Sequence, residues 1–360
     1  RRMGRKGFFL NLDDYYRRHG VKTYFQNAAV GLDVRRGLVE LDRGEKIHYD
    51  QLLIATGSSP VKPPIENIDS PGIFHLWTLQ DALAIDERLC AGKKLAVIGS
   101  GFISMMAADA AAGRGLEVTV VELMPRIMPR VLDEESAALL RRSVQERGVK
   151  IEVGSLVEKV ETGSDGSITL LMQDHSSLTV DLVIVGAGVK PNLDVVSGSP
   201  VEVDRGILVD EGMRTNVTGI YAAGDVTQGP TIFGEKHEAC PLWVTAVEQG
   251  KVAGANMAGQ DLAYEGSLNL NVTQLFGLTV ASMGRFESGK GREREVYRRD
   301  GEYAALFREG EVPVGAVVAG DPGMVRLLGF LRPYIKYRKI LKPTLDQLIA
   351  RLDGVIFSPS

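Results

Sequence analysis

The sequence has few cysteines and lacks a long apolar run. Its 360 residues include two cysteines, Cys90 and Cys240, too far apart in the chain for a disulfide framework or a cysteine metal cluster to be read from their spacing. So few cysteines are typical of proteins of the reducing cytoplasm. No apolar stretch is long enough to cross a bilayer, and no signal peptide is recognisable. We therefore expect a cytoplasmic protein with no metal site and no transmembrane segment.

The chain also lacks an excess of positive charge. Its net charge of −4 gives no reason to expect nucleic acid as a partner. An apolar fraction of 44% beside 24% charged residues is typical of a globular protein with a sizeable core. Because the chain is longer than one ordinary domain, we predict two or three domains.

Residues 94–122 predict a strand, a Gly-rich turn, a helix and a second strand. The turn reads Gly-Ser-Gly-Phe-Ile-Ser, and apolar runs lie on both sides of the helix. In such a βαβ unit Gly99 permits the tight turn and Gly101 lets the backbone approach a pyrophosphate, while the helix start directs free N–H groups toward it. The order of these elements favours a dinucleotide site over an ordinary strand-to-helix turn.

Two further residues define this site. Glu122 closes the second strand, where a carboxylate accepts hydrogen bonds from a ribose diol and repels a 2′-phosphate. This favours NADH over NADPH. Ser104 occupies the third glycine position of the turn, where its hydroxymethyl group must fit between a closely packed helix and strand.

Two antiparallel meanders are predicted before and after this unit. Residues 23–50 give three short alternating runs, and residues 150–185 give three more, at 150–160, 168–172 and 178–185. Helices are expected over 78–91 and from Asp133 onward. Gly-containing segments at 55–57 and 186–192 each follow an apolar strand, and the second is suited to close approach of a dinucleotide.

A second strand-and-loop arrangement follows. Strands are expected over 206–210 and 218–223, and the second ends in Gly224 and Asp225. An Asp there points into the crevice where open α/β sheets bind ligands. Its alternative role is a helix N-cap. Because nothing clearly helical follows until residue 242, ligand contact is favoured, and 242–258 form a helix with small residues on one face.

Residues 265–360 change character. Five short strand-like runs are followed by a helical, locally basic segment that contains Pro333. A basic amphipathic helix is typical of a membrane surface. The alternative is an amphipathic helix packed on its own sheet, and we favour it because solvated charged faces are common and prolines interrupt a long apolar stripe.

The motifs together resemble the FAD-dependent pyridine nucleotide-disulfide oxidoreductases, and most closely the branch with nitrite reductase flavoproteins, rubredoxin reductases, NADH oxidases and coenzyme A-disulfide reductases. The motifs that carry the resemblance are ATG at 55–57, VIGSGFIS at 97–104, VVELMPRIMPR at 120–130, GAGVKPN at 186–192, IYAAGD at 220–225 and PLWVTAVEQGKVAGANMAG at 241–259.

The resemblance implies an α/β fold with two nested Rossmann-like dinucleotide-binding domains, each with a three-stranded meander, and a C-terminal α+β interface domain. The FAD domain would comprise 1–87 and 201–262, the NADH domain 88–200 and the interface domain 263–360. By the same resemblance NADH would be bound by Gly99, Gly101, Ser104, Glu122 and Gly188. FAD would be bound by Thr56, Gly57, Gly224, Asp225, Trp243 and Thr245.

This sequence departs from the family pattern at three points. No Gly-x-Gly-x-x-Gly motif precedes Ala55, and because the first residue is Arg1 we expect that an N-terminal piece, with any redox cysteine, is missing. Met106 stands where a glutamate is common, and a thioether cannot stabilise charge as a carboxylate does. Asp86 stands where a basic residue is common.

The implied activity is transfer of a hydride from NADH to FAD, followed by transfer of electrons to a redox protein, oxygen, or a disulfide or persulfide. The sequence assigns no catalytic acid or base, and it favours an inert, buried role for Cys240. The departures at Met106 and Asp86 support a second hypothesis, a weakened or non-catalytic nucleotide-binding subunit of a redox complex. A homodimer or a subunit of such a complex is expected.

Overall fold

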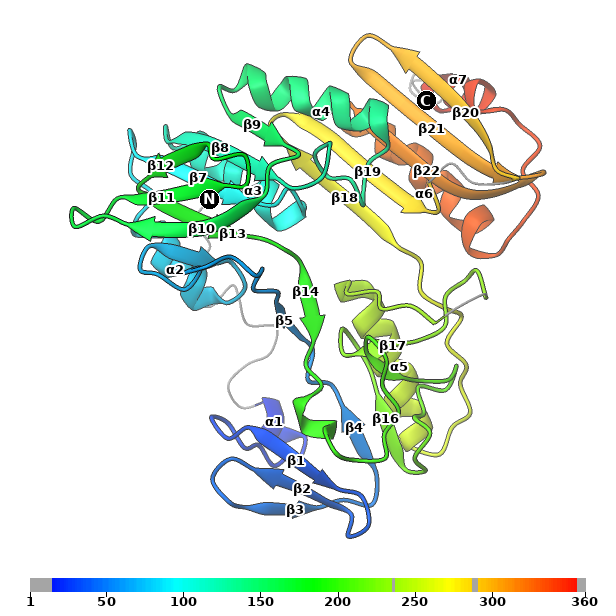
Figure 1. The fold of residues 1–360 in the computed structure, drawn as a ribbon. Coiled ribbons are helices and arrows are strands. Elements are labelled where there is room, and N and C mark those ends of the chain that lie inside the picture. The colour runs from blue at the N-terminus through cyan, green and yellow to red at the C-terminus, as the bar shows by residue number, and fades with distance from the viewer. Residues whose placement is uncertain (1–14, 235–236, 287–290, 355–360) are drawn as a thin grey trace.

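The computed structural model describes residues 15–234, 237–286 and 291–354. Three units are visible in Figure 1: a central α/β unit in cyan and green, a C-terminal unit in yellow to red beside it, and a third unit built from a blue and a yellow-green part of the chain. None of the helices in the described ranges is long and apolar enough to span a membrane.

The central unit is a parallel sheet of five strands in the order β6-β13-β7-β8-β9. Its central strand β7 is buried from Leu95 onward, because helices cover one face of the sheet and the antiparallel meander of residues 157–180 covers the other. The strands are β6 (Ile73–His75), β7 (Lys94–Ile98), β8 (Glu117–Glu122), β9 (Lys150–Val153) and β13 (Leu182–Val185), and the helices are α2 (Leu79–Asp86), α3 (Phe102–Ala112) and α4 (Glu134–Glu146). The edge strand β6 belongs to this sheet although it precedes residue 88, which the resemblance gave as the first residue of the NADH domain.

The second meander differs from its prediction. The strand expected over 150–160 is two strands, because the chain turns at Gly154 with φ +68°, so that β9 joins the parallel sheet and β10 begins the meander. The run at 178–185 is also divided, at Asp181, whose backbone and side chain bond to Lys94. The meander is β10 (Val157–Thr162), β11 (Ile168–Met172) and β12 (Ser177–Val180).

The helix expected over 78–91 is shorter than predicted. Thr78 caps α2 in a capping box with Asp81, but the helix ends at Asp86. The backbone N–H of Gly92 donates to the carbonyl of Gly115, which draws the chain toward the start of β7. The helix predicted from Asp133 onward is confirmed as α4. Asp133 is its N-cap, because the Asp133 carboxylate accepts from the backbone N–H of Ser136 at 3.1 Å.

The third unit combines residues from both sides of the central unit. The first meander is antiparallel as predicted, and β4 pairs in parallel with β16, which brings the chain around 54 beside the chain around 222. Its elements are α1 (Tyr15–Arg18), β1 (Ala29–Asp33), β2 (Leu38–Leu41), β3 (Lys46–His48), β4 (Leu52–Ile54), β15 (Ile207–Leu208), β16 (Ile220–Ala222), β17 (Thr227–Gln228), α5 (Trp243–Met257) and a 3-10 turn at Asp194–Val196. The expectations for residues 1–14 lie outside the described residues.

Two short antiparallel strands connect the third unit to the central one. These are β5 (Ser58–Pro60) and β14 (Val189–Pro191), and they pair over their full length. Residues 186–192, which the sequence indicated only as a Gly-containing segment after a strand, therefore include a strand of their own. Figure 1 shows this pair running between the two units.

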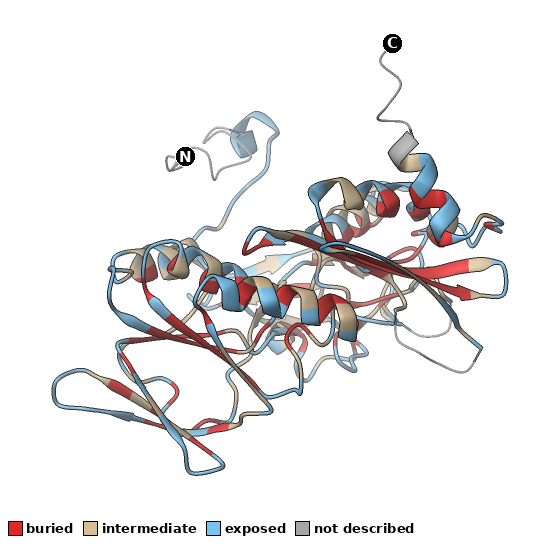
Figure 2. Ribbon diagram, turned by 90° about the horizontal axis from the view of Figure 1, so that it is seen from above, coloured by how far each residue is buried: buried red, intermediate tan, exposed pale blue. Residues whose placement is uncertain are grey.

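The C-terminal unit is an antiparallel sheet in the order β18-β19-β22-β21-β20, buried on both faces. One face shares a continuous apolar core with α3 and α4 of the central unit, and the other packs against α6 and α7. Figure 2 shows the resulting band of buried residues along these strands. The elements are β18 (Leu270–Leu275), β19 (Leu278–Gly284), β20 (Glu293–Arg299), β21 (Glu302–Glu309), β22 (Val312–Gly320), a 3-10 turn at Pro322–Met324, α6 (Val325–Lys336) and α7 (Leu345–Gly354).

The basic C-terminal helix packs on its own sheet, as favoured from the sequence. Leu327, Leu331 and Ile335 of α6 are almost completely buried against the sheet. The helix continues through Pro333.

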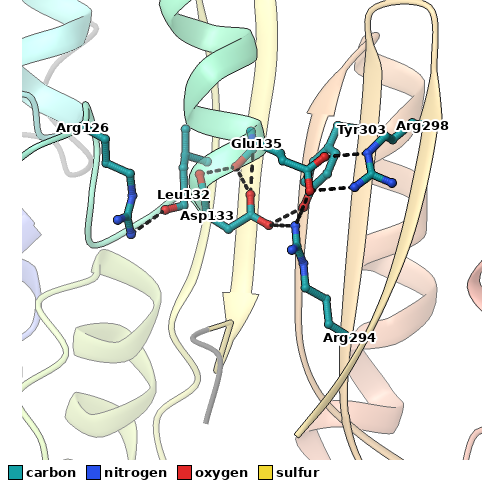
Figure 3. Close-up of polar contacts among 8 residues, drawn as sticks. Arg126, Leu132, Asp133, Glu135, Arg294, Arg298 and Tyr303 are labelled. Carbon is teal, nitrogen blue, oxygen red and sulfur yellow. Dashed lines mark hydrogen bonds and ion pairs between the residues drawn. The ribbon is translucent and has the colours of Figure 1, made fainter.

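A polar cluster adds to the contact between α4 and the C-terminal sheet (Figure 3). Arg298 donates to both carboxylate oxygens of Glu135, at 2.6 and 2.8 Å, and Arg294 donates to Glu135 at 2.9 Å and to Asp133 at 3.1 Å. The buried Tyr303 hydroxyl donates to the Asp133 carboxylate. The carboxylates that begin α4 are thus bound to cations of β20.

We expect this cluster to weaken in acid. The Arg298 and Arg294 guanidinium groups lower the pKa of Glu135, although partial burial opposes them. A lowered folded pKa stabilises the protein above the unfolded pKa of about 4.3, and this stabilisation is lost as the pH falls through the folded value. The melting temperatures of wild type and Glu135→Gln should therefore differ at pH 7 and converge below about pH 4. If the melting temperatures of wild type and Glu135→Gln differed as much below pH 4 as at pH 7, the pairing of Glu135 with Arg294 and Arg298 would be contradicted.

Candidate functional site

The turn after β7 has a backbone that only glycine suits. Gly99 has φ +91°, and a Cβ built on it would lie 2.5 Å from the carbonyl oxygen of Gly186 at the end of β13. Its N–H donates to the Val121 carbonyl at 2.8 Å. The turn is therefore held against the ends of both neighbouring strands.

Gly101 is the N-cap of α3, and it faces open space. A Cβ built on Gly101 would meet no atom within 4 Å, and no side chain caps the helix. The first N–H groups of α3 therefore have no capping acceptor from a side chain, which together with the helix dipole makes this end an anion site. Its assignment to the pyrophosphate of NADH stays a prediction.

Ser104 fits the close contact between helix and strand because of a glycine opposite it. Its side chain is buried, and the hydroxyl donates to the Gly186 carbonyl at 3.4 Å. A Cβ on Gly186 would collide with the Ser104 hydroxyl. The sequence predicted the tight contact, and the structure adds Gly186 as the residue that relieves it.

Glu122 is buried at the end of β8 and is fixed by three hydrogen bonds. One oxygen accepts from the Ser100 N–H at 2.8 Å and from the Ser100 hydroxyl at 2.5 Å, and the other accepts from the Met124 N–H at 2.8 Å. Ser100 also accepts from the Met128 N–H at 2.9 Å. Ser100 was not predicted as a site residue, although its place between Gly99 and Gly101 was the available signal. Since a carboxylate has about four acceptor positions, one remains available, and its use by a ribose hydroxyl stays a prediction.

The two residues that depart from the family pattern lie in different surroundings. Met106 is half exposed on α3, as is Ile103 one turn earlier. Asp86 forms an ion pair at 2.5 Å with Arg114, beyond the end of α3. The Asp86 carboxylate thus pairs with a cation of the same unit.

The predicted FAD residues gather where the third unit meets the β5–β14 pair. The Asp225 carboxylate accepts from the Ser58 hydroxyl at 2.8 Å. The Thr56 hydroxyl donates to the Asn192 carbonyl at 2.8 Å, and the Asn192 side-chain amide donates to the Thr56 carbonyl at 2.9 Å. Sequence reasoning missed Ser58 and Asn192, because their partners are distant in the chain.

The two glycines of this region have left-handed backbones. Gly57 has φ +67° and Gly224 has φ +84°. The Gly224 N–H donates to the Gln249 side chain at 2.8 Å, and Gln249 also accepts from the Thr227 hydroxyl at 3.0 Å. Asp225 is followed by β17 and not by a helix, so it does not act as an N-cap.

The segment before α5 presents one exposed aromatic ring and one buried polar group. Trp243 is 70% exposed, whereas Thr245 is buried and donates to the Cys240 sulfur at 3.5 Å. Burial raises the pKa of the Cys240 thiol, so the sulfur stays protonated at neutral pH. This supports the inert role expected for Cys240.

Gly188 lies between the two groups of residues. Its φ is +99°, and its carbonyl accepts from the Val61 N–H at 2.9 Å, next to β5. The structure thus brings Gly99, Gly101, Ser104 and Glu122 together at one edge of the parallel sheet. It brings Thr56, Gly57, Gly224 and Asp225 together at the other end of the β5–β14 pair, with Gly188 in between.

The residues present fit the two nucleotides unequally. At the start of α3 the open space over Gly101 and the uncapped N–H groups fit a dinucleotide diphosphate. On the other side Asp225 and the exposed Trp243 ring fit a polar chain and a flat apolar ring, respectively. The described residues 15–87, 201–234 and 237–262 contain no Gly-x-Gly-x-x-Gly turn for a second diphosphate. No group of acidic, cysteine or histidine side chains in the described ranges is arranged to hold a metal ion.

Several known proteins are similar to this chain in sequence. The family model for pyridine nucleotide-disulphide oxidoreductases matches residues 9–250. The chain is 32% identical to the epsilon subunit of an NADH-dependent phenylglyoxylate dehydrogenase of Aromatoleum evansii, over 86% of this chain and 77% of that one. It is also 32% identical to an NADH oxidase of Methanocaldococcus jannaschii, over 76% and 62%, so it spans under two thirds of that relative.

Solved structures share the fold. A water-forming NADH oxidase from Lactobacillus brevis superposes with a TM-score of 0.87 at 22% identity, covering 98% of this chain and 87% of that one. An NAD-dependent persulfide reductase from A. fulgidus gives 0.83 at 26%, covering 95% and 70%. These findings confirm the α/β fold with an antiparallel C-terminal unit. The chain belongs to the pyridine nucleotide-disulphide oxidoreductase family, a family of NAD(P)H-dependent flavoprotein oxidoreductases.

Proposed function

We propose that the protein transfers a hydride from NADH to FAD and passes the electrons to a separate acceptor. The observation that supports this most directly is the short β5–β14 pair between the two predicted nucleotide sites. At one end Gly188 follows Gly186, which lies against Gly99 and Ser104. At the other end Ser58 donates to Asp225. The two sites are thus built on one continuous stretch of bonded backbone.

The chain's own residues would bind and orient the two nucleotides. The start of α3, with Gly99 and Gly101, would hold the NADH diphosphate, and Glu122 would hold the ribose. Asp225, Thr56 and the segment at Trp243 and Thr245 would hold FAD. Bound FAD accepts a hydride and can release electrons one at a time. No side chain is proposed to act as an acid or base in the transfer.

The test is anaerobic titration of the full-length protein with NADH while the flavin absorbance is recorded. We expect the oxidised flavin spectrum to bleach with NADH, and more slowly with NADPH because the Glu122 carboxylate repels a 2′-phosphate. Persistence of the oxidised spectrum with FAD bound would refute the proposed activity. Faster bleaching by NADPH would refute only the role of Glu122.

The second candidate is a subunit that binds nucleotide with little turnover of its own. The observation that favours it is the exposed Met106 on α3, where the family commonly has a glutamate. The chain is also 31% identical to an assimilatory nitrate reductase electron transfer subunit of Bacillus subtilis, over 87% of this chain and 40% of that one. A colourless full-length protein that still binds NADH would favour this candidate, and a yellow protein that NADH bleaches would exclude it.

A further inference from the structure

Ser100 is buried between the two glycines that form the turn after β7. It is only 1% exposed, although Gly101 beside it faces open space. Its hydroxyl donates to the Glu122 carboxylate at 2.5 Å and accepts from the Met128 N–H at 2.9 Å. Ser100 therefore bonds both to the end of β8 and to the loop at 123–132 that follows it.

These bonds determine which oxygen of Glu122 can accept a further hydrogen bond. Oε2 accepts from both the N–H and the hydroxyl of Ser100, and Oε1 accepts from the Met124 N–H at 2.8 Å. Each carboxylate oxygen has about two acceptor positions, so Ser100 fills those of Oε2. A ribose hydroxyl that approaches Glu122 would therefore be directed to Oε1.

The loop after β8 is folded around the residue that Ser100 binds. Met128 is buried and has φ +47°, a conformation that residues other than glycine rarely adopt. Its carbonyl accepts from the Leu132 N–H at 3.0 Å. The Arg126 guanidinium donates to the Pro129 carbonyl at 3.1 Å and to the Leu132 carbonyl at 3.5 Å (Figure 3). The loop is thus held by its own bonds, and the Ser100 hydroxyl ties it to the Gly-rich turn.

The charge of this loop makes the placement of Glu122 important. Residues 123–132 include Arg126 and Arg130 and no acidic residue. Arginine binds phosphate groups well, so the charge of the loop alone would favour a 2′-phosphate and hence NADPH. Discrimination against NADPH then depends on the Glu122 carboxylate being held where a 2′-phosphate would lie.

We propose that Ser100 is a positioning residue that sets the preference of this site for NADH over NADPH. This inference rests on the proposed function, in which Glu122 binds the ribose of NADH. The hydroxyl hydrogen of Ser100 is used by Glu122 and the side chain is buried, so Ser100 acts on the nucleotide through the Glu122 carboxylate.

The alternative is that the Ser100 side chain only stabilises the turn. Its removal leaves the buried Met128 N–H without the hydroxyl partner, which lowers stability. A loosened turn would weaken the binding of NADH and NADPH by similar factors. A displaced carboxylate changes the two affinities by different factors, because it faces a hydroxyl in NADH and a phosphate in NADPH. The ratio of the two Kd values therefore separates these roles.

The test measures the Kd of the full-length protein for NADH and for NADPH by calorimetric titration. In Ser100→Ala, the ratio of the NADPH Kd to the NADH Kd should fall roughly tenfold, as expected when one hydrogen bond to a charged group is lost. Ser100→Cys fills a similar space with a weaker donor and should lower the ratio as well. The inference is overturned if wild type binds both nucleotides equally, or if the ratio in Ser100→Ala stays at the wild-type value or rises. If Ser100→Ala does not fold, an unchanged ratio in Ser100→Cys overturns it.

Ser136→Ala is the matched control. Ser136 is also buried in the central unit, and its hydroxyl donates to a carboxylate at 2.6 Å, but this is the carboxylate of Asp133 at the start of α4. We expect Ser136→Ala to lose stability and to keep the wild-type ratio of Kd values. If Ser136→Ala and Ser100→Ala lowered the ratio equally, the role assigned to Ser100 would be wrong.

A second comparison adds Ser100→Ala to Glu122→Gln. Because no carboxylate then remains to be held, the added change should leave the Kd ratio where Glu122→Gln alone puts it. A further tenfold fall would mean that Ser100 acts independently of Glu122, which would overturn the inference. These titrations do not depend on reduction of the flavin. If the ratios behaved as expected but NADH did not bleach bound FAD, the proposed hydride transfer would be refuted and the role of Ser100 would stand.

Discussion

Replacement of Gly101 by alanine is expected to abolish tight NADH binding without affecting the fold. The structure has open space where the new methyl group would stand, and the φ of −67° suits alanine. The methyl group would occupy the space in which a diphosphate approaches the backbone, so the Kd for NADH should rise by roughly 10- to 100-fold. Calorimetric titration of NADH measures this, and thermal unfolding should stay at the wild-type temperature.

Gly99→Ala is the matched comparison. Here alanine would adopt φ +91° and place its Cβ 2.5 Å from the Gly186 carbonyl oxygen. We expect this variant to lose NADH binding and also roughly 2–4 kcal/mol of stability, because strained backbone and steric overlap both act on the folded state. If Gly101→Ala bound NADH as tightly as wild type, the start of α3 would not be the diphosphate site.

Replacement of Arg308 by methionine is expected to destabilise the C-terminal unit strongly. Arg308 is buried in β21 and donates to Glu295 of β20, to the Leu341 carbonyl, and to the Pro343 carbonyl at 2.6 Å. Removal of the guanidinium takes the buried donor from both carbonyls and leaves Glu295 with only the Leu345 N–H among the described residues, and breaking a buried ion pair costs about 3 kcal/mol. The melting temperature should fall by roughly 5–10 °C.

The control for this prediction is Arg298→Met. Arg298 also binds a carboxylate at two points, but its side chain is 62% exposed. Solvent screens such a pair, and its loss should change the stability by less than about 1 kcal/mol. If Arg308→Met and Arg298→Met lowered the melting temperature equally, burial of Arg308 would not be the reason for its contribution to stability. FAD content should be unchanged in both variants, because neither residue lies near Asp225.

Local patterns predicted the nucleotide turn well. Gly99, Gly101 and Ser104 lie within six residues, and both neighbouring strands are apolar, so the position of α3 follows from nearby sequence alone. The first meander and the five C-terminal strands were also predicted, whereas two of the three runs expected in the second meander are divided between the meander and the parallel sheet. Assignment of Gly99 and its neighbours to NADH, and of Asp225 and its neighbours to FAD, stays a prediction.

Features that depend on distant contacts were not predictable in this way. The division of residues 150–160 into β9 and β10 depends on pairing with β8 and on a turn at Gly154, whereas the apolar pattern runs on across it. The partners of Arg308 lie more than ten positions away along the chain, and nothing near it in sequence indicates burial of a cation. Asn192 bonds to Thr56 across 136 positions for the same reason.

The C-terminal sheet has a consequence for self-association. Helices already cover both of its faces, so a second copy of the chain has no open face on which to stack. Among the described residues, symmetric pairing would therefore use the outer sides of α6 and α7 or one of the two edge strands, β18 and β20. The β20 edge carries Glu293, Arg294 and Arg298, and charged edge strands resist pairing with another sheet. A homodimer built on this unit would thus not be formed by joining two β20 strands into an extended sheet.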